Sequence, residues 1–435
     1  MEIYVVQPGD NLFGIAQAFG VPMSHIIEDN RLPNPSLLVV GQTLVIRFPE
    51  EVYTVQPGDT LASVALQSGL SLRQLYRNNP ILEGQPTLYP GQTLVLRYQG
   101  SPGPSVTVNS YAYPFINQSL LQRTLPFLTY LTPFTYGIQE DGELVSLDDE
   151  PLIAMGRAVG TAALMHLSTL TESGNFSNDL ANLVLNDLSL QEVLIDNVLT
   201  TLQTKGYSGL DVDFEFIFPQ DALPYAAFIR RLRDRLNPLG YPVIVALAPK
   251  TSSDQPGLLY EGHSYRDLGE AANRVFLMTY EWGYTYGPPM AVAPLPNVRA
   301  VVEYALTEIP AEKLWLGVPN YGYDWPLPFL QGKTRATSIS PQYAVSLAAR
   351  YRSSISYDET AQAPWFRYTD ENGTKHEVWF EDARSIRAKL SLIPEYGLDG
   401  AGYWNLMRPF PQNWLVLDSL FTIRETPLPA GLLRS

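Results

Sequence analysis

From residue 106 onward, short apolar runs alternate with segments in which apolar residues recur at helical spacing. Strands that alternate with helices in this way are typical of a parallel α/β architecture. The clearest helical segment follows Ser189, where Ser189 and Glu192 predict a capping box. Eight strands with intervening helices indicate a (β/α)8 TIM barrel. The strands are predicted at residues 106–113, 127–136, 162–168, 209–216, 243–248, 274–280, 314–319 and 400–404.

The interval between the seventh and eighth predicted strands is longer than the other crossovers. A helical pattern covers residues 343–351, and Asn372-Gly373 is typical of a hairpin turn. We therefore expect a small α+β insertion at about residues 325–380, which would wall one side of the barrel opening.

The first hundred residues contain a repeat of about 49 to 50 positions. Tyr4-Val-Val-Gln-Pro-Gly-Asp10 recurs as Tyr53-Thr-Val-Gln-Pro-Gly-Asp59, and Gly41-Gln-Thr-Leu recurs as Gly91-Gln-Thr-Leu. In each copy the pattern predicts a strand, two helices and a closing strand, in the order βααβ.

Each copy of the repeat is predicted to form one domain. The second helix of each is expected to begin at a serine N-cap, Ser24 in the first copy and Ser71 in the second. The predicted domains are residues 2–48, 51–98 and 106–435, with a turn-rich linker at 99–105.

Composition excludes several classes of function. The 435 residues contain no cysteine, which excludes disulfides and thiolate metal ligands. A net charge of −15 argues against nucleic acid as a partner. No apolar run is long enough to span a membrane, and the amino-terminal residues lack a signal-peptide pattern. The four histidines show no ligand spacing, so we expect neither a metal site nor a cofactor; they are His25, His166, His263 and His376.

The fourth predicted strand carries the candidate chemistry. One face is apolar and bulky, with Leu210, Val212, Phe214 and Phe216. The other face carries Asp211, Asp213 and Glu215. In a strand, the α-carbons of Asp213 and Glu215 are roughly 6.6 Å apart, so their carboxyl groups can share a proton. Such a row raises the pKa of at least one member, which keeps a general acid protonated near neutral pH. A solvated acidic strand face is the alternative.

Residues 208–215, Ser-Gly-Leu-Asp-Val-Asp-Phe-Glu, resemble the Asp-x-x-Asp-x-Asp-x-Glu pattern of the family 18 glycoside hydrolases. This family includes chitinases and peptidoglycan N-acetylglucosaminidases. Only Ser208 departs from the pattern, which affects the expected charge network rather than the proton donor. The resemblance implies retaining, substrate-assisted hydrolysis. In it Glu215 is the general acid, Asp213 and Tyr280 hold the substrate acetamido group, and Asp211 supports Asp213.

Further positions at predicted strand ends resemble the sugar site of the same family. Met278-Thr-Tyr280-Glu281 matches a Met-x-Tyr-Asp pattern except at Glu281, and Trp404 stands where the family has the floor of the site. The predicted substrate-binding residues are Trp404, Tyr111, Met278, Glu281, Asn320 and Tyr323. For any single aromatic residue among them, packing in the core is the alternative.

The two repeats resemble LysM modules, which bind polymers that contain N-acetylglucosamine. The resemblance implies that the sugar lies between residues 9–12 and 32–37 in the first copy, and between 58–61 and 81–86 in the second. The predicted binding residues are Gly9, Asp10, Asn11, Leu12, Gly58, Asp59, Thr60 and Leu61. Alternatively, the Pro-Gly-Asp motif only forms a turn and caps a helix.

Tandem LysM modules followed by such a barrel resemble the spore-cortex-lytic N-acetylglucosaminidases, the YaaH-like spore germination proteins. The resemblance covers the whole chain and implies cleavage after N-acetylglucosamine in cortex peptidoglycan or its fragments. It also implies a location on the spore or cell wall, with peptidoglycan or another N-acetylglucosamine polymer as partner. Two alternatives stay open: a chitinase or endo-N-acetylglucosaminidase for another glycan, and a non-catalytic glycan-binding spore-coat protein.

Overall fold

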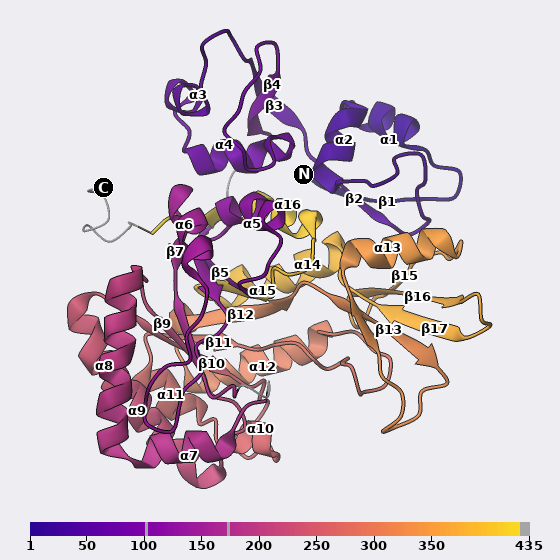
Figure 1. The fold of residues 1–435 in the computed structure, drawn as a ribbon. Coiled ribbons are helices and arrows are strands. Elements are labelled where there is room, and N and C mark those ends of the chain that lie inside the picture. Colours follow the sequence, from indigo (N-terminus) through magenta and orange to yellow (C-terminus); the bar gives the residue numbers. More distant parts are fainter. Residues whose placement is uncertain (101–102, 172–174, 427–435) are drawn as a thin grey trace.

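The computed structural model describes residues 1–100, 103–171 and 175–426 (Figure 1). Residues 101–102 of the predicted linker, and residues 172–174 and 427–435 of the predicted barrel region, lie outside the described part. Two small amino-terminal units lie beside one another above a larger unit that contains the parallel sheet and the insertion (Figure 1).

The larger unit is a parallel barrel sheet, as the pattern predicts. Its third strand is divided at Leu164 into β7 and β8, which pair with β6 and β9 respectively, so the sheet nearly closes on itself. A short strand, β19, adds to β5. The strands are β5 (Ser105–Ala112), β6 (Tyr130–Pro133), β7 (Ala162–Ala163), β8 (Met165–Ser168), β9 (Leu210–Asp213), β10 (Val243–Leu247), β11 (Arg274–Leu277), β12 (Leu314–Pro319), β18 (Gly400–Trp404) and β19 (Thr422–Ile423).

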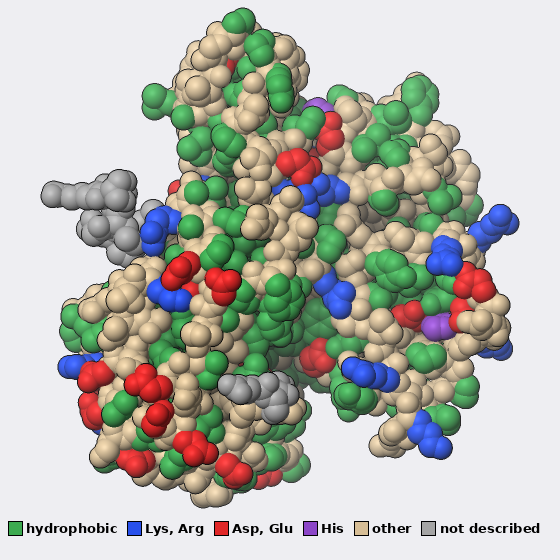
Figure 2. Space-filling view, in the orientation of Figure 1, with side chains coloured by type: hydrophobic (Ala, Val, Ile, Leu, Met, Phe, Trp, Pro, Cys, Tyr) green, Lys and Arg blue, Asp and Glu red, His purple; other side chains and the backbone are tan. Residues whose placement is uncertain are grey.

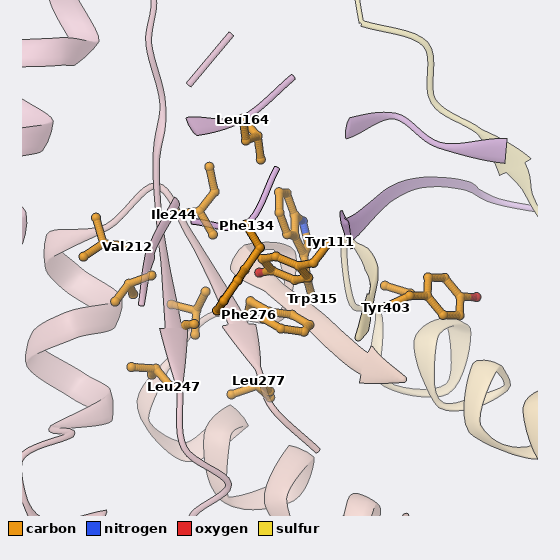
Figure 3. Close-up of a cluster of buried hydrophobic side chains, with 14 of the residues drawn as sticks. Tyr111, Phe134, Leu164, Val212, Ile244, Leu247, Phe276, Leu277, Trp315 and Tyr403 are labelled. Atoms are coloured by element: carbon orange, nitrogen blue, oxygen red, sulfur yellow. The ribbon is translucent and has the colours of Figure 1, made fainter. Parts of the chain in front are cut away.

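Helices surround the barrel, and strand residues that point outward pack against them. Phe214, which directly follows β9, stacks on Tyr225 and Phe228 of α9 (Ala222–Leu236), with ring centroids 5.5 and 5.9 Å apart. Figure 3 shows Tyr111 and Phe276 together, while Tyr403 points away from them toward the helices. The helices are α5 (Gln118–Thr124), α6 (Glu150–Ala158), α7 (Asn178–Asn186), α8 (Leu188–Lys205), α9 (Ala222–Leu236), α10 (Leu258–Glu261), α11 (Tyr265–Ala271), α12 (Leu295–Glu308), α14 (Ala383–Leu390), α15 (Leu392–Tyr396) and α16 (Pro411–Leu420). Short 3-10 turns occur at Pro80–Leu82, Leu125–Phe127, Pro219–Asp221, Asn237–Leu239 and Ala311–Lys313.

Two local predictions in this unit are wrong. Helix α8 begins before Ser189, because the Asp187 side chain accepts hydrogen bonds from the backbone N–H groups of Ser189 and Leu190. Strand β9 ends at Asp213, and Phe216 has φ +57° and is 37% exposed. Phe216 therefore does not continue the apolar face of the strand, because the chain has already turned there.

The insertion between β12 and β18 is a small α+β unit, as predicted, and consists of an antiparallel five-stranded sheet with one helix. The strand order is β14-β13-β17-β16-β15, and β16 and β17 are joined by the predicted turn at Asn372-Gly373, where Gly373 has φ +81°. The elements are β13 (Gly322–Leu327), β14 (Thr337–Ile339), α13 (Pro341–Arg350), β15 (Ser356–Asp358), β16 (Ala363–Thr369) and β17 (Lys375–Trp379).

Both amino-terminal units have the predicted βααβ order, and in each the first strand pairs antiparallel with the last. Ser71 caps α4 as expected. The prediction for Ser24 is wrong, because α2 begins at Met23 and its cap residue, Pro22, offers no side-chain acceptor. The elements are β1 (Glu2–Val5), α1 (Leu12–Phe19), α2 (Met23–Asn30), β2 (Thr43–Ile46), β3 (Pro49–Thr54), α3 (Leu61–Ser68), α4 (Leu72–Asn78) and β4 (Thr93–Tyr98). Across the described ranges, we find no helix that is both long and apolar enough to cross a membrane.

Candidate active site

A cavity of about 370 Å³ opens where the barrel strands end. On the face shown in Figure 2, the surface is hollowed between the barrel and the insertion, and hydrophobic side chains gather there. Seven of the predicted site residues line this catalytic cavity: Tyr111, Asp213, Glu215, Met278, Tyr280, Glu281 and Trp404. The carboxyl end of a barrel is where residues from several strands meet, so the fold brings these side chains together from distant parts of the chain.

Asp211 lies deepest in the acidic row and does not line the cavity. It is fully buried, and its carboxylate accepts a hydrogen bond of 2.7 Å from the hydroxyl of Tyr111. Burial raises the pKa of Asp211 to about 7, while the Tyr111 hydrogen bond acts in the opposite direction. Tyr111 therefore holds an internal carboxyl group, in addition to lining the cavity.

Asp213 is buried between Asp211 and Glu215. Burial, followed by the charges of Glu215 and Asp211, raises the pKa of Asp213 well above its ordinary value. One carboxylate oxygen, Oδ1, has no hydrogen-bond partner among the described residues. An acid in this position favours protonation or an incoming hydrogen-bond donor, because an unpaired buried carboxylate is costly.

The other oxygen of Asp213 lies 3.6 Å from Nε2 of His166, which is not among the predicted site residues. His166 is buried, and burial lowers its pKa to about 3, so the ring is neutral at physiological pH. Its Nδ1 lies 2.6 Å from the hydroxyl of Thr135. The available signal was alternation in strand 162–168, since His166 is in register with Asp211.

Glu215 follows the end of β9 and reaches into the cavity. Burial, and next the charge of Glu281, raises the pKa of Glu215 to about 7. The backbone beside it is fixed, because Nε2 of His263 lies 2.9 Å from the carbonyl oxygen of Phe214. Since Nδ1 of His263 accepts from the N–H of Ala248, its Nε2 is the nitrogen that donates. Glu215 can therefore be protonated near neutral pH in a fixed position.

Tyr280 and Glu281 follow β11. Tyr280 is 8% exposed, and Glu281 has φ +67°. The Glu281 carboxylate accepts hydrogen bonds from the hydroxyls of Tyr321 and Tyr323, the latter at 3.0 Å. Burial raises the pKa of Glu281, and these two hydrogen bonds oppose the rise. The two tyrosines thus restrain the longer side chain that replaces the aspartate of the family pattern.

Trp404 is surrounded by aromatic rings. Its centroid lies 5.7 Å from that of Tyr111, 5.0 Å from Phe134 and 6.2 Å from Tyr113. Tyr113 and Phe134 also line the cavity, and our prediction omitted both. They stand at the ends of the first two predicted strands, so the strand-end criterion that selected Tyr111 would have found them.

The remaining barrel residues lie elsewhere. Tyr323 lines a second chamber, of about 360 Å³, next to the catalytic cavity. Asn320 is buried, lines neither space, and its side chain has no hydrogen-bond partner in the described part of the chain. Ser208 precedes β9, lines neither space, and donates its backbone N–H to the carbonyl oxygen of Ala163.

The motif residues of the amino-terminal units form turns and caps. Asp10 accepts hydrogen bonds from the hydroxyl of Tyr4 at 2.6 Å and from the backbone N–H of Gln7 at 2.7 Å. Asp59 makes the same two contacts in the second copy. Asn11 and Thr60 cap helices, Leu12 and Leu61 are buried, and Gly9 and Gly58 have positive φ. Sugar binding by these eight residues stays a prediction.

Among the described residues, no group of three or more His, Asp or Glu side chains is arranged to hold a metal ion. The side chains at the cavity offer acid–base and electrostatic chemistry through their carboxyl and phenol groups.

The model of the glycosyl hydrolases family 18 matches residues 117–408. The chain belongs to family 18 of the glycosyl hydrolases. LysM domain models match residues 4–47 and 53–97. This family 18 member is thus a glycoside hydrolase that carries two LysM modules, which indicate binding of a glycan.

Two relatives are similar over almost the whole of this family 18 chain. The cortical fragment-lytic enzyme of Bacillus subtilis (strain 168) is 43% identical, across 97% of this chain and 99% of the relative. The crystal structure of the spore cortex-lytic enzyme SleL of Bacillus megaterium QM B1551 has a TM-score of 0.83 and 39% identity, over 98% of this chain and 99% of that one. A chitinase from Chromobacterium violaceum has a TM-score of 0.67 and 27% identity, over 72% of this chain and 98% of that one.

Proposed function

We propose that this family 18 enzyme cleaves the glycosidic bond after N-acetylglucosamine in bacterial peptidoglycan. Its substrate is spore cortex or cortex fragments released during germination, and it acts on the spore or cell wall. The observation that carries the proposal is the pair of Asp213 and Glu215 in one cavity, both with raised pKa. The full-length similarity to two enzymes named for cortex lysis supports this substrate over chitin.

In the proposed mechanism, protonated Glu215 gives its proton to the glycosidic oxygen as the bond from that oxygen to the anomeric carbon breaks. The oxygen of the substrate's own 2-acetamido group forms the new bond to this carbon. Water then attacks the same carbon while the bond from this carbon to the acetamido oxygen breaks, and the water loses a proton to Glu215. A raised pKa of about 7 suits both roles, because a group that titrates near the working pH can donate and accept.

Asp213 holds the acetamido N–H in this proposal and balances the positive charge that develops on the group. Its unpartnered oxygen supports that role, because an incoming N–H would satisfy it. Tyr280 donates its hydroxyl to the acetamido oxygen, and Asp211 supports Asp213. His166 positions Asp213, and Tyr111 positions Asp211.

The test compares the wild-type enzyme with the Glu215→Gln variant on two substrates, purified cortex fragments and a chitin oligosaccharide. We expect the wild type to release fragments with new N-acetylglucosamine reducing ends from cortex, observed by mass spectrometry. The variant should bind the fragments but not cleave them, because the amide cannot donate the proton. Turnover of the variant at the wild-type rate would contradict the assignment of Glu215.

The substrates separate the remaining alternatives. Cleavage of the chitin oligosaccharide alone would favour a chitinase, the activity named for the Chromobacterium violaceum relative. Binding of cortex fragments without cleavage by either protein would favour the non-catalytic glycan-binding alternative.

A further inference from the structure

The second chamber borders the catalytic cavity, because Tyr113, Glu281 and Trp404 line both. Its far side is formed by the insertion, through Tyr323 and Ser338, and by the segment after β18, through Asn405 and Arg408. A glycan that places one sugar in the catalytic cavity would place a neighbouring unit in this chamber.

Arg408 is the only Lys or Arg among the described residues that line either space. Its guanidinium is half-buried, and burial lowers its pKa. Within the described ranges, it makes no ion pair and no hydrogen bond. The more deeply buried Arg47 and Arg77 are paired with Asp29 and Asp418 respectively, at 2.9 and 2.8 Å. A partly desolvated arginine without a partner is costly unless a ligand supplies one.

No carboxylate that lines either space forms an ion pair with Arg408 within the described ranges. Glu281 lies at the boundary between the two spaces, but its carboxylate is bound by Tyr321 and Tyr323 and forms no ion pair with Arg408. Asp213 and Glu215 line only the catalytic cavity. An anionic group on the substrate is therefore repelled from the acidic end and attracted to the Arg408 end.

Charged side chains are also distributed unevenly over the wider surface. Asp and Glu side chains gather over the region of α7 and α8, whereas Lys and Arg side chains occur beside Asp and Glu over the insertion (Figure 2). An anionic polymer would therefore meet less repulsion on the insertion side of the hollow, which is also the side of the second chamber.

We propose that the second chamber is a carboxylate-binding subsite in which Arg408 pairs with an acidic group on the sugar next to the bound N-acetylglucosamine. This rests on the proposed function, since the neighbouring amino sugar of peptidoglycan carries a lactyl ether that ends in a carboxylate or a peptide. Chitin carries no such group. Arg408 would then fix the register of the glycan and favour peptidoglycan over neutral N-acetylglucosamine polymers. A guanidinium suits this task because it can donate two parallel hydrogen bonds to one carboxylate.

The test uses a peptidoglycan tetrasaccharide with free lactyl carboxyl groups and the same tetrasaccharide with those groups converted to methylamides. For the wild type, we expect kcat/KM to be about 10- to 100-fold higher on the carboxylate form, the usual range for one hydrogen bond to a charged group. Arg408→Met should reduce this preference to about one, and Arg408→Lys should retain part of it. The matched control is Arg230→Met, which removes an exposed arginine from α9 and should keep the full preference.

The outcomes separate this inference from the proposed function. Cleavage of both forms at equal rates by the wild type would overturn the carboxylate subsite and leave the peptidoglycan hydrolase intact. If the wild type cleaves neither form, the proposed function fails, and calorimetric titration of the Glu215→Gln variant then decides the inference. Tighter binding of the carboxylate form that is lost on adding Arg408→Met would support the subsite, and equal binding of the two forms would overturn it.

Discussion

Glu215 and Asp211 illustrate how single residues in this site oppose the stability of the fold. Burial raises the pKa of each to about 7, so between their ordinary pKa and pH 7 the folded protein holds protons that the unfolded chain has released. Folding stability therefore falls as the pH rises through this window. Relative to the ionised carboxylate, the bound proton of each group stabilises the folded state. This stabilisation is fully present below about pH 4 and is lost as the pH passes about 7.

This effect predicts that Glu215→Gln stabilises the enzyme while it removes hydrolysis. The amide cannot ionise, so its stability does not fall over this pH range. The difference in the free energy of unfolding between the variant and the wild type should therefore grow by about 1 to 3 kcal/mol from pH 5 to pH 8. Urea unfolding at both pH values measures the difference. Glu140→Gln, which changes an exposed carboxylate, is the control and should show no such change. A pH-independent difference for Glu215→Gln would contradict the prediction.

At the same scale, sequence and structure agree where a motif identifies a residue. Strict alternation placed Asp211 and Asp213 on one side of a strand, and the structure has both facing inward. Alternation within residues 162–168 offered a weak signal for His166, but no motif surrounds either His166 or Arg408. They approach the site only through barrel closure and the turn after β18, which depend on contacts between segments far apart in the chain.

At the scale of elements, the eight strands and the insertion were predictable. The spacing of apolar residues along a whole segment indicates its type even when contacts with distant segments are unknown. The ends of the elements were not predictable, because the residue that caps a helix depends on the backbone conformation at that one position. The start of α8 shows this. Ser189 and Glu192 match a capping box, but Asp187, one residue before the helix, accepts the hydrogen bonds of the free N–H groups in the first turn.

The cap of α8 gives a paired prediction. Asp187→Ala should lower the free energy of unfolding by about 1 kcal/mol, because two backbone N–H groups lose their acceptor. Ser189→Ala is the matched control and should cost less than about 0.5 kcal/mol, since Asp187 rather than Ser189 caps the helix and alanine is the better helix former. Thermal unfolding of both variants measures the difference. A larger effect at Ser189 would restore the capping-box interpretation.

At the scale of the whole molecule, the sequence suggests two modules attached by a linker, whereas the structure packs both modules onto the catalytic unit. Arg73 of the second module donates hydrogen bonds to the carbonyl oxygens of Pro126 and Gly160 in the barrel region. Arg77 of the same module pairs with Asp418 of α16. These partners are far away in sequence and belong to no repeat, so no pattern could reveal them. The LysM modules are thus held in a fixed direction relative to the active site.

The first module is held through its backbone, and here the repeat supplies its own control. The N–H of Ile355, in the insertion, donates to the carbonyl oxygen of Val40 at 2.9 Å. The next residue, Gly41, has φ +85°, and a Cβ at this position would lie 1.9 Å from the carbonyl oxygen of Ile355. Its counterpart in the second module, Gly91, has φ +86° but no atom within 4 Å of the corresponding position. Both glycines are thus required by the same turn, and only Gly41 is also required by docking.

Gly41→Ala should therefore separate the first LysM module from the insertion, while Gly91→Ala should not. Each substitution strains a left-handed backbone position and costs about 1 kcal/mol within its module. Only Gly41→Ala also forces Ile355 away, so only this variant should show a larger radius of gyration in small-angle X-ray scattering. It should also show faster proteolysis near residues 40–41. If cleavage of long cortex strands then falls while cleavage of a tetrasaccharide is unchanged, the fixed module guides polymeric substrate. Equal scattering of the two variants would mean that the module is held by its other contacts.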